Sequence, residues 1–340
     1  MSATPARMAA AQLAPWYGFD ATSPRSLAEM ERLNEADAGC FILLLSGSEA
    51  RFLQKPAHYP AEEIAGTREA THNLLSRALR YRRLFEDVLR KRPVDGAIRL
   101  ALSVDDLVPE ATIPLFTFQK KRGSRLVLLP DSDFLRHRFY AAPKFADTIP
   151  FEAKQDRALF VGSTSGGGTL TAENVRALRA PRLRAAMQFR GAPRVDFWLP
   201  RIVQTADQAA SDAIAALGVS GRPLDWADHH AYRYLLSMDG NGATCSRVAL
   251  ALRGNGVLVK YESEHRLHYF DRLIPWTHYI PVGSDAEVER AMDLCAATPG
   301  LARSIAEAGT AFYRTHLERA ALLEYTRDLL ATYAAWCRRA

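Results

Sequence analysis

The chain has 340 residues, 48% of them hydrophobic and 24% charged, which is close to the composition of globular proteins and argues against a disordered chain. Its formal net charge is +6, but the basic residues are scattered in pairs without a nucleic-acid-reading motif, so we expect no nucleic-acid partner. The 4 cysteines lie far apart, and neither a signal peptide nor an apolar stretch of about 18 residues is found, so we expect a cytoplasmic protein.

The N-terminal part of the chain reads as helices followed by short apolar runs. Apolar residues recur at helical intervals over 26–38, and 61–90 is a long amphipathic stretch with a leucine stripe. The runs that are typical of strands in a parallel α/β sheet are 40–45, 97–104, 113–118 and 125–129. One turn of buried helix remains an alternative for 40–45, because periodicity does not separate the two.

A second α/β series begins near Arg157. Its expected elements are a strand at 158–161, a helix at 171–179, strand-like segments at 231–238, 257–261 and 278–282, and an almost continuous helical tail over 285–336. Prolines between 130 and 150 indicate a linker between the two series. The pattern therefore predicts two α/β domains with a boundary near 150, a class that fits several kinds of enzyme.

A glycine-rich turn follows the strand at 158–161, in the sequence Phe160-Val-Gly-Ser-Thr-Ser-Gly-Gly-Gly-Thr169. Its first small residues, Gly162, Ser163 and Thr164, let backbone N–H groups approach a phosphate before a helix. The turn is neither a Walker A loop, because no lysine follows the glycines, nor the dinucleotide fingerprint G-x-G-x-x-G. Taken alone, a flexible surface loop is an equally good interpretation.

A second group of small residues includes Asp239, Gly240 and Asn241, and a helix-like run follows it. Ser246 and Arg247 fall in the first turn of that helix, where the arginine can form two hydrogen bonds to a diphosphate. From these residues alone, a hairpin turn with the arginine paired to a carboxylate is slightly favoured.

Two carboxylates follow strand-like runs. Asp106 comes after the run 97–104, where a general base of an α/β enzyme would lie, although paired acids are also common solvated caps. Asp105 is expected to be a bystander. Glu264 follows the run 257–261, where a carboxylate can hold the hydroxyls of a ribose or simply face solvent.

The histidines are interpreted as structural. His278 lies alone among Trp, Tyr and Pro residues. His229 and His230 are adjacent, and on a helix their side chains diverge by about 100°, so we expect no shared metal ion.

In this order the motifs resemble glycosyltransferase family 90, which includes capsule-associated xylosyltransferases, Rumi-like protein O-glucosyltransferases and bacterial lipopolysaccharide-modifying homologues. The resemblance extends over 97–325. It is carried by Ala231-Tyr-Arg-Tyr-Leu-Leu-Ser-Met-Asp-Gly-Asn-Gly242, Ser246-Arg247, Pro275-Trp-Thr-His-Tyr-Ile-Pro-Val282, Phe160-Val-Gly-Ser163 and Leu102-Ser-Val-Asp-Asp106.

The resemblance implies an α/β fold of GT-B type, two Rossmann-like domains facing across a cleft. Residues 1–150 would form the acceptor-side domain, 151–315 the UDP-sugar-binding domain, and 316–340 a helix packing back on the first domain. It also implies a UDP-sugar donor, inversion, and neither cofactor nor metal. Asp106 would be the general base. The donor would be held by Gly162, Ser163, Thr164, Asp239, Gly240, Asn241, Ser246, Arg247 and Glu264, with Ser163 and Arg247 on the diphosphate.

One departure concerns the diphosphate. Animal members carry an arginine shortly after the F-x-G-S turn, whereas this chain continues with Thr164. A diphosphate contact is then either missing or supplied from elsewhere, such as by Arg176, Arg182 or Arg184. For the acceptor we expect lipopolysaccharide, another cell-surface glycan or a lipid-linked saccharide, with peripheral membrane contact compatible with the basic charge. The alternatives are an inactive glycan-binding scaffold of GT-B type and, less favoured, a two-domain NAD-dependent oxidoreductase.

Overall fold

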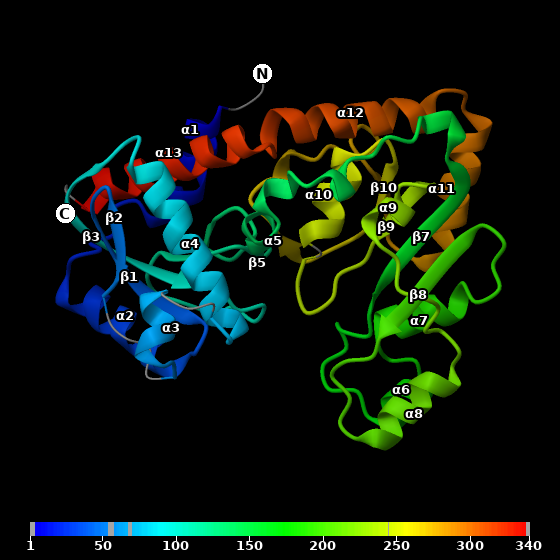
Figure 1. The fold of residues 1–340 in the computed structure, drawn as a ribbon, viewed down its shortest axis with the longest axis horizontal. Coiled ribbons are helices and arrows are strands. Elements are labelled where there is room, and N and C mark those ends of the chain that lie inside the picture. The colour runs from blue at the N-terminus through cyan, green and yellow to red at the C-terminus, as the bar shows by residue number, and fades with distance from the viewer. Residues whose placement is uncertain (1–3, 54–57, 67–69, 244, 338–340) are drawn as a thin grey trace. The chain divides into compact units, whose positions relative to one another are not determined.

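The computed structural model describes residues 4–53, 58–66, 70–243 and 245–337. The chain forms two compact units, each built around its own sheet (Figure 1). Unit 1 consists of Met1–Phe139, Arg266–His268 and Glu318–Ala340, and unit 2 of Tyr140–His265 and Tyr269–Leu317. The chain therefore first changes unit at Phe139, earlier than the boundary expected at 150. Among the described residues, no helix is both long enough and apolar enough to cross a membrane.

The sheet of unit 1 is mixed. Its strand order is β2-β1-β3-β4-β6, and the strands are β1 (Cys40–Gly47), β2 (Glu49–Phe52), β3 (Val94–Ser103), β4 (Leu115–Thr117) and β6 (Val127–Leu128). The run at 40–45 is a strand, so its helical alternative is wrong. The expected parallel sheet is found only from β3 to β6, because β1 pairs antiparallel with both of its neighbours. Gly47, with φ of +55°, allows the chain to reverse at once into β2.

Helices cover this sheet. They are α1 (Pro5–Leu13), α2 (Pro24–Ala36), α3 (Ala61–Ala65), α4 (Asn73–Leu89), α5 (Ser132–Arg136) and α13 (Arg319–Cys337). The stretch expected as one helix over 61–90 is two helices, because Gly66 ends α3 in the left-handed conformation. The last helix, α13, is held on the sheet by two hydroxyls: Tyr325 donates to the carbonyl of Leu128 at 2.6 Å and Tyr333 to that of Arg99 at 3.0 Å.

The sheet of unit 2 is entirely parallel. Its order is β12-β10-β9-β7-β8, and the strands are β7 (Gln155–Ser163), β8 (Val195–Arg201), β9 (Tyr232–Ser237), β10 (Val257–Tyr261) and β12 (Ile280–Val282). From β7 the chain moves outward to β8 and then returns to the other side of β7 to form β9. The strand order therefore reverses between β7 and β9, and the carboxyl ends of strands at such a point form the usual ligand crevice of doubly wound folds.

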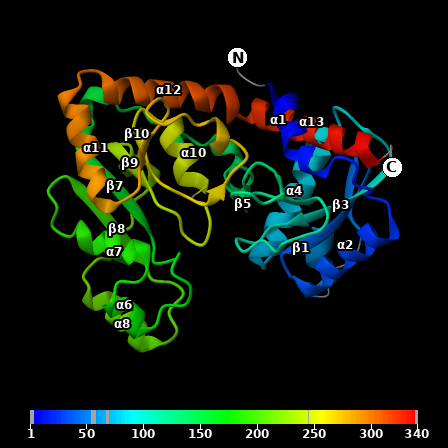
Figure 2. The same ribbon diagram turned by 180° about the vertical axis from the view of Figure 1, so that it is seen from behind.

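The helices of unit 2 are α6 (Ala172–Arg176), α7 (Pro181–Gln188), α8 (Gln208–Ala216), α9 (Trp226–His229), α10 (Cys245–Arg253), α11 (Asp285–Ala297) and α12 (Leu301–His316) (Figure 2). The sequence analysis missed α7, β8 and α8, although β8 alternates the buried Val195, Phe197 and Leu199 with less buried residues, as is typical of a strand. The hairpin alternative for 239–242 is wrong, because β9 and β10 are parallel and α10 lies between them along the chain.

Candidate functional site

Two loops meet at the switch point of unit 2, and glycines let them touch. The β7 loop (residues 163–169) and the β9 loop (residues 238–243) follow neighbouring parallel strands. A Cβ on Gly166 would lie 3.0 Å from the Cα of Gly240, and Gly166 has φ of +102°. The backbone N–H of Gly166 donates to Oδ1 of Asn241 at 3.2 Å. The expected residues Gly240 and Asn241 therefore hold the two loops together.

Arg182 lies between the two loops and is only 4% exposed. It comes from the first turn of α7, and its guanidinium donates to the carbonyls of Ser163 (3.1 Å), Met238 (2.9 Å) and Asp239 (3.1 Å). It also donates to the hydroxyl of Ser165 at 3.0 Å. The sequence analysis names Arg182 only as one of three candidates to replace the family arginine. Nothing in its local sequence indicates that it lies at the centre of the site.

Arg247 reaches the carboxyl-terminal part of β7 from the first turn of α10. Its guanidinium carbon lies 4.3 Å from the centroid of the Phe160 ring, and its Nη2 donates to the carbonyl of Val161. Its Nε is buried without a hydrogen-bond partner among the described residues. Gly162 leaves the room for this arrangement, because a Cβ there would lie 2.7 Å from Phe160 and 3.5 Å from Nη2 of Arg247.

The two arginines carry positive charge that the surrounding residues do not neutralise by direct pairing. Within the described part of the chain, neither Arg182 nor Arg247 forms an ion pair with a carboxylate, unlike Arg184, which pairs with Asp285 at 3.3 Å. Burial lowers the pKa of both guanidinium groups, and for Arg247 the charge of Arg182 lowers the pKa further. Because burying a charge without a partner is costly, this arginine pair indicates a site for an anion. We call these two residues the arginine pair.

The hydroxyl residues of the β7 loop divide into two groups. Ser163 and Ser165 are partly exposed, and their hydroxyls lie 2.9 Å apart. Thr164 is fully buried, and its hydroxyl accepts from the backbone N–H of Val203 at 2.9 Å and donates to the carbonyl of Val203 at 2.8 Å. The backbone N–H of Thr164 donates to the carbonyl of Arg201 at 3.0 Å, so Thr164 anchors the loop to the end of β8, and its expected place in the donor site stays a prediction.

The other expected donor residues lie around the same strand ends. Asp239 accepts a hydrogen bond from the hydroxyl of Ser263, a residue that the sequence patterns did not single out. Ser246 lies beside Arg247 in the first turn of α10. Glu264 is exposed in the segment after β10. Within the described ranges, no hydrogen bond or ion pair of Glu264 indicates a structural role, and its expected role at the ribose stays a prediction.

Asp106 lies in unit 1, three residues beyond the end of β3. Its carboxylate accepts a hydrogen bond from Nη1 of Arg77 at 2.9 Å, and the same nitrogen donates to the carbonyl of Val104. Its backbone carbonyl accepts from the side-chain amide of Gln119 at 2.7 Å. The carboxylate remains 42% exposed. Asp106 is thus held at both ends and is still accessible, as a residue that contacts substrate must be.

Each histidine that was interpreted as structural has a local structural contact. Nδ1 of His229 lies 2.9 Å from the carbonyl of Asp225, and burial lowers the pKa of His229 to about 4. His230 is buried 3.6 Å from Asp147. Nδ1 of His278 accepts from the backbone N–H of Ile274 at 2.9 Å and closes the loop before β12. Among the described residues, no group of three or more His, Cys, Asp or Glu side chains is placed to hold a metal ion.

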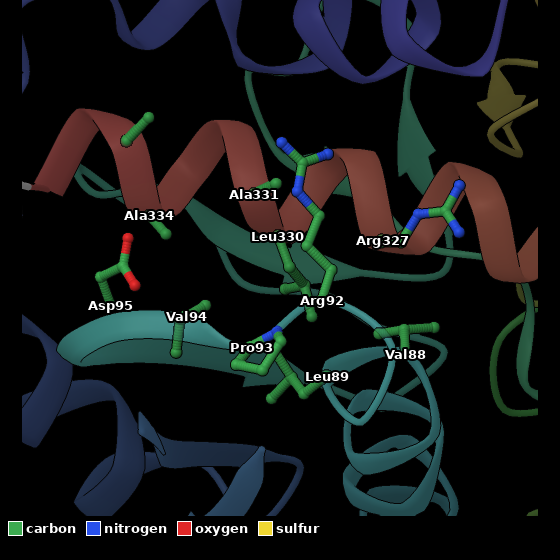
Figure 3. Close-up of a pocket in the computed structure, with 11 residues that line it drawn as sticks. Val88, Leu89, Arg92, Pro93, Val94, Asp95, Arg327, Leu330, Ala331 and Ala334 are labelled. Carbon is green, nitrogen blue, oxygen red and sulfur yellow. The ribbon is translucent and has the colours of Figure 1, made fainter. Parts of the chain in front are cut away.

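A separate pocket of about 160 Å³ lies within unit 1, between the end of α4, the start of β3 and α13 (Figure 3). Its floor is apolar, with Leu89 and Leu330 among its residues. The arginines that line it have acidic neighbours: Arg92 lies 3.7 Å from Asp328, and Arg327 lies 3.7 Å from a glutamate on its own helix. None of the expected site residues lines this pocket, and its charges are balanced, so we regard it as a gap in the packing of α13.

The two α/β units confirm the predicted α/β class and supply the components of a GT-B-type protein, although the sheet of unit 1 is mixed. The family model described as glycosyl transferase family 90 matches residues 148–339, more than half of the chain. The chain belongs to glycosyl transferase family 90, as the motifs of the sequence indicated.

Curated relatives match parts of this chain. Protein O-glucosyltransferase 1 from Homo sapiens is 32% identical over 141 residues, which are 40% of this chain and 36% of that protein. Protein O-glucosyltransferase 2 from Danio rerio is 33% identical over 112 residues, or 33% of this chain and 22% of that protein. The O-glucosyltransferase rumi from Drosophila pseudoobscura pseudoobscura is 29% identical over 113 residues, or 32% of this chain and 27% of that protein. The similarity thus spans between about a fifth and about a third of these relatives.

Among solved structures, sucrose-phosphate synthase from Thermosynechococcus elongatus matches with a TM-score of 0.34 and 12% identity over 55% of this chain and 47% of that chain. The C-terminal domain of a group 1 family glycosyl transferase from Francisella tularensis matches with a TM-score of 0.29 and 12% identity over 48% of this chain and 85% of that chain. These similarities are too low to carry an argument about function.

Proposed function

We propose that this protein transfers a sugar from a UDP-sugar to a hydroxyl group of a glycan acceptor, with inversion of the anomeric carbon and without a metal ion. The observation that supports this best is the arginine pair at the switch point of unit 2, since neither guanidinium, of Arg182 or of Arg247, has a carboxylate partner among the residues that the structure describes. A diphosphate leaving group gains negative charge as its bond to the sugar breaks, and fixed positive charge lowers the energy of that state.

The reaction is a single displacement in which Asp106 is the base. The carboxylate of Asp106 takes the proton of the acceptor hydroxyl as its oxygen forms a bond to the anomeric carbon. The bond between that carbon and the β-phosphate oxygen breaks on the opposite side, and its electron pair leaves with UDP. Arg247 donates hydrogen bonds to the departing diphosphate and so replaces the positive charge that a metal ion supplies in other transferases.

For the donor sugar, the names of the relatives suggest glucose, because they are described as O-glucosyltransferases. For the acceptor, we propose lipopolysaccharide or another cell-surface glycan, in free or lipid-linked form. We place the reaction in the cytoplasm, and the net charge of +6 would favour peripheral contact with the anionic inner face of a membrane.

The first test is a calorimetric titration of the full chain with UDP, GDP, CMP, NAD, UDP-glucose, UDP-xylose and UDP-galactose in the presence of EDTA. We expect micromolar binding of UDP that EDTA does not weaken, and tighter binding of one of the UDP-sugars. Binding of NAD alone would favour the oxidoreductase, and loss of UDP binding in EDTA would refute the metal-independent mechanism.

The second test is turnover. The sugar that binds best is supplied in labelled form with lipopolysaccharide, and transfer or hydrolysis is followed by release of UDP. Arg179→Gln is a matched control, since this exposed arginine lies three residues before Arg182 along the chain and pairs with Glu173 at 3.8 Å. We expect release of UDP from the wild type and from this control. Binding of a UDP-sugar without any release would favour the inactive scaffold.

A further inference from the structure

Arg182 makes hydrogen bonds that use almost all of its donors inside the protein. A guanidinium has five N–H groups and cannot accept a hydrogen bond. In Arg182 they go to three backbone carbonyls, of Ser163, Met238 and Asp239, and to the hydroxyl of Ser165. A ligand that reaches the loops from solvent is therefore left with at most one N–H of this residue. Its effect on a bound anion has to pass mainly through the groups that it holds.

The hydroxyls of Ser163 and Ser165 are the groups through which Arg182 acts on a bound anion. Both hydroxyl oxygens face Nη1 of Arg182, at 3.4 Å for Ser163 and 3.0 Å for Ser165, and they lie 2.9 Å from each other. The arginine can only donate, so neither hydroxyl hydrogen points toward it. One hydrogen lies between the two oxygens. The other has no acceptor among the described residues, and both serines are partly exposed.

We propose that Arg182 is a positioning residue that turns this remaining O–H of the Ser163–Ser165 pair toward a phosphate oxygen of the donor. The proposal rests on the proposed function and identifies how the β7 loop recognises the diphosphate. A carboxylate in place of Arg182 would accept the hydroxyl hydrogens and turn them inward. A neutral residue would leave their direction undetermined. The buried guanidinium instead polarises both hydroxyls and leaves them as donors, which suits an anion.

The test compares UDP with uridine, which lacks the phosphates. For Arg182→Gln we expect the affinity for UDP to fall by about tenfold or more, since a charge-assisted contact is lost, and the affinity for uridine to stay within about twofold. Ser165→Ala should lower UDP affinity in the same sense. The double variant should bind UDP about as weakly as Arg182→Gln alone, because the arginine acts through the serine hydroxyls. Arg179→Gln serves as the matched control and should bind both ligands like the wild type.

An equal loss of UDP and uridine in Arg182→Gln would overturn the proposal, because it would show that the arginine only holds the loops in shape. Unchanged UDP binding would overturn it as well. Should Arg182→Gln fail to fold, the variant with both Ser163→Ala and Ser165→Ala decides: unchanged UDP affinity there refutes the proposal. Inorganic pyrophosphate separates this inference from the proposed function. A wild type that binds pyrophosphate but not UDP contradicts the UDP-sugar donor, and the serine variants then still test the positioning.

Discussion

Replacing Arg247 by methionine removes a charge and keeps much of the side chain's volume over the Phe160 ring. Its guanidinium carbon lies 4.3 Å from the ring centroid, its Nε has no partner among the described residues, and no described carboxylate pairs with it. A hydrogen bond to a charged group contributes about 1.5 to 3 kcal/mol. We therefore expect UDP to bind about ten to a hundred times more weakly to Arg247→Met, measured by calorimetry at one fixed salt concentration.

The same change should leave the protein as stable as before. The variant loses the charge-assisted hydrogen bond to the carbonyl of Val161, which is worth about 1.5 to 3 kcal/mol, but burying an unpaired charge costs a similar amount, and the variant is freed of that cost. We expect the free energy of unfolding in urea to change by less than about 1.5 kcal/mol. Affinity for UDP would then fall without a loss of stability, as is typical of residues kept for function. Unchanged UDP affinity, or a destabilisation of several kcal/mol, would show that Arg247 is structural.

Three further changes test the base, the buried charges and the pH dependence. Asp106→Asn should abolish transfer while UDP affinity stays nearly unchanged, because the base contacts the acceptor; loss of UDP binding in the same variant would contradict this role. Lys154→Met should destabilise unit 2 by about 3 kcal/mol in urea unfolding, because the buried Asp147 loses its lysine partner at 2.8 Å and keeps, among the described residues, only backbone hydrogen bonds and His230 at 3.6 Å. The pKa of His229 is lowered to about 4 by burial, so its neutral form stabilises the fold above its ordinary pKa of about 6.5, and this stabilisation is lost as the pH falls toward 4. Between pH 7 and pH 5 the wild type should lose about 2 kcal/mol more than His229→Gln, and equal losses would refute the assigned shift.

The elements with a strong local pattern were predicted from the sequence. The strands β7, β9 and β10 of unit 2 are short apolar runs, and the amphipathic helices α2 and α4 have regular apolar spacing. The type of each element can therefore be predicted from its own residues. Pairing is different. The residues of β1 do not by themselves determine that this strand pairs antiparallel with both neighbours. The pairing depends on the chain reversal at Gly47 and on where later segments join the sheet.

The candidate site shows the same division. The sequence identified Gly162 and Gly240 as places of close backbone approach, and the structure gives each a neighbour that leaves no room for a side chain. It also placed Thr164 in the donor site, but a hydroxyl at that position can face either the ligand or the next strand. The structure decides for the strand, since Thr164 bonds the backbone of Val203.

The sequence by itself determined the family, the two α/β series and the small residues that follow β7 and β9. Only the tertiary structure decided which positively charged side chain lies among these small residues. Arg182 is 19 residues from Ser163 and 57 residues from Asp239 along the chain, and it touches both because β7 and β9 are neighbours in the sheet. A sequence pattern shows the spacing of residues within one segment. The strand order of the sheet brings together segments that can be any distance apart along the chain. The pairing of Arg182 with Arg247, neither of which has a described carboxylate partner, arises from that neighbourhood and indicates the anion site.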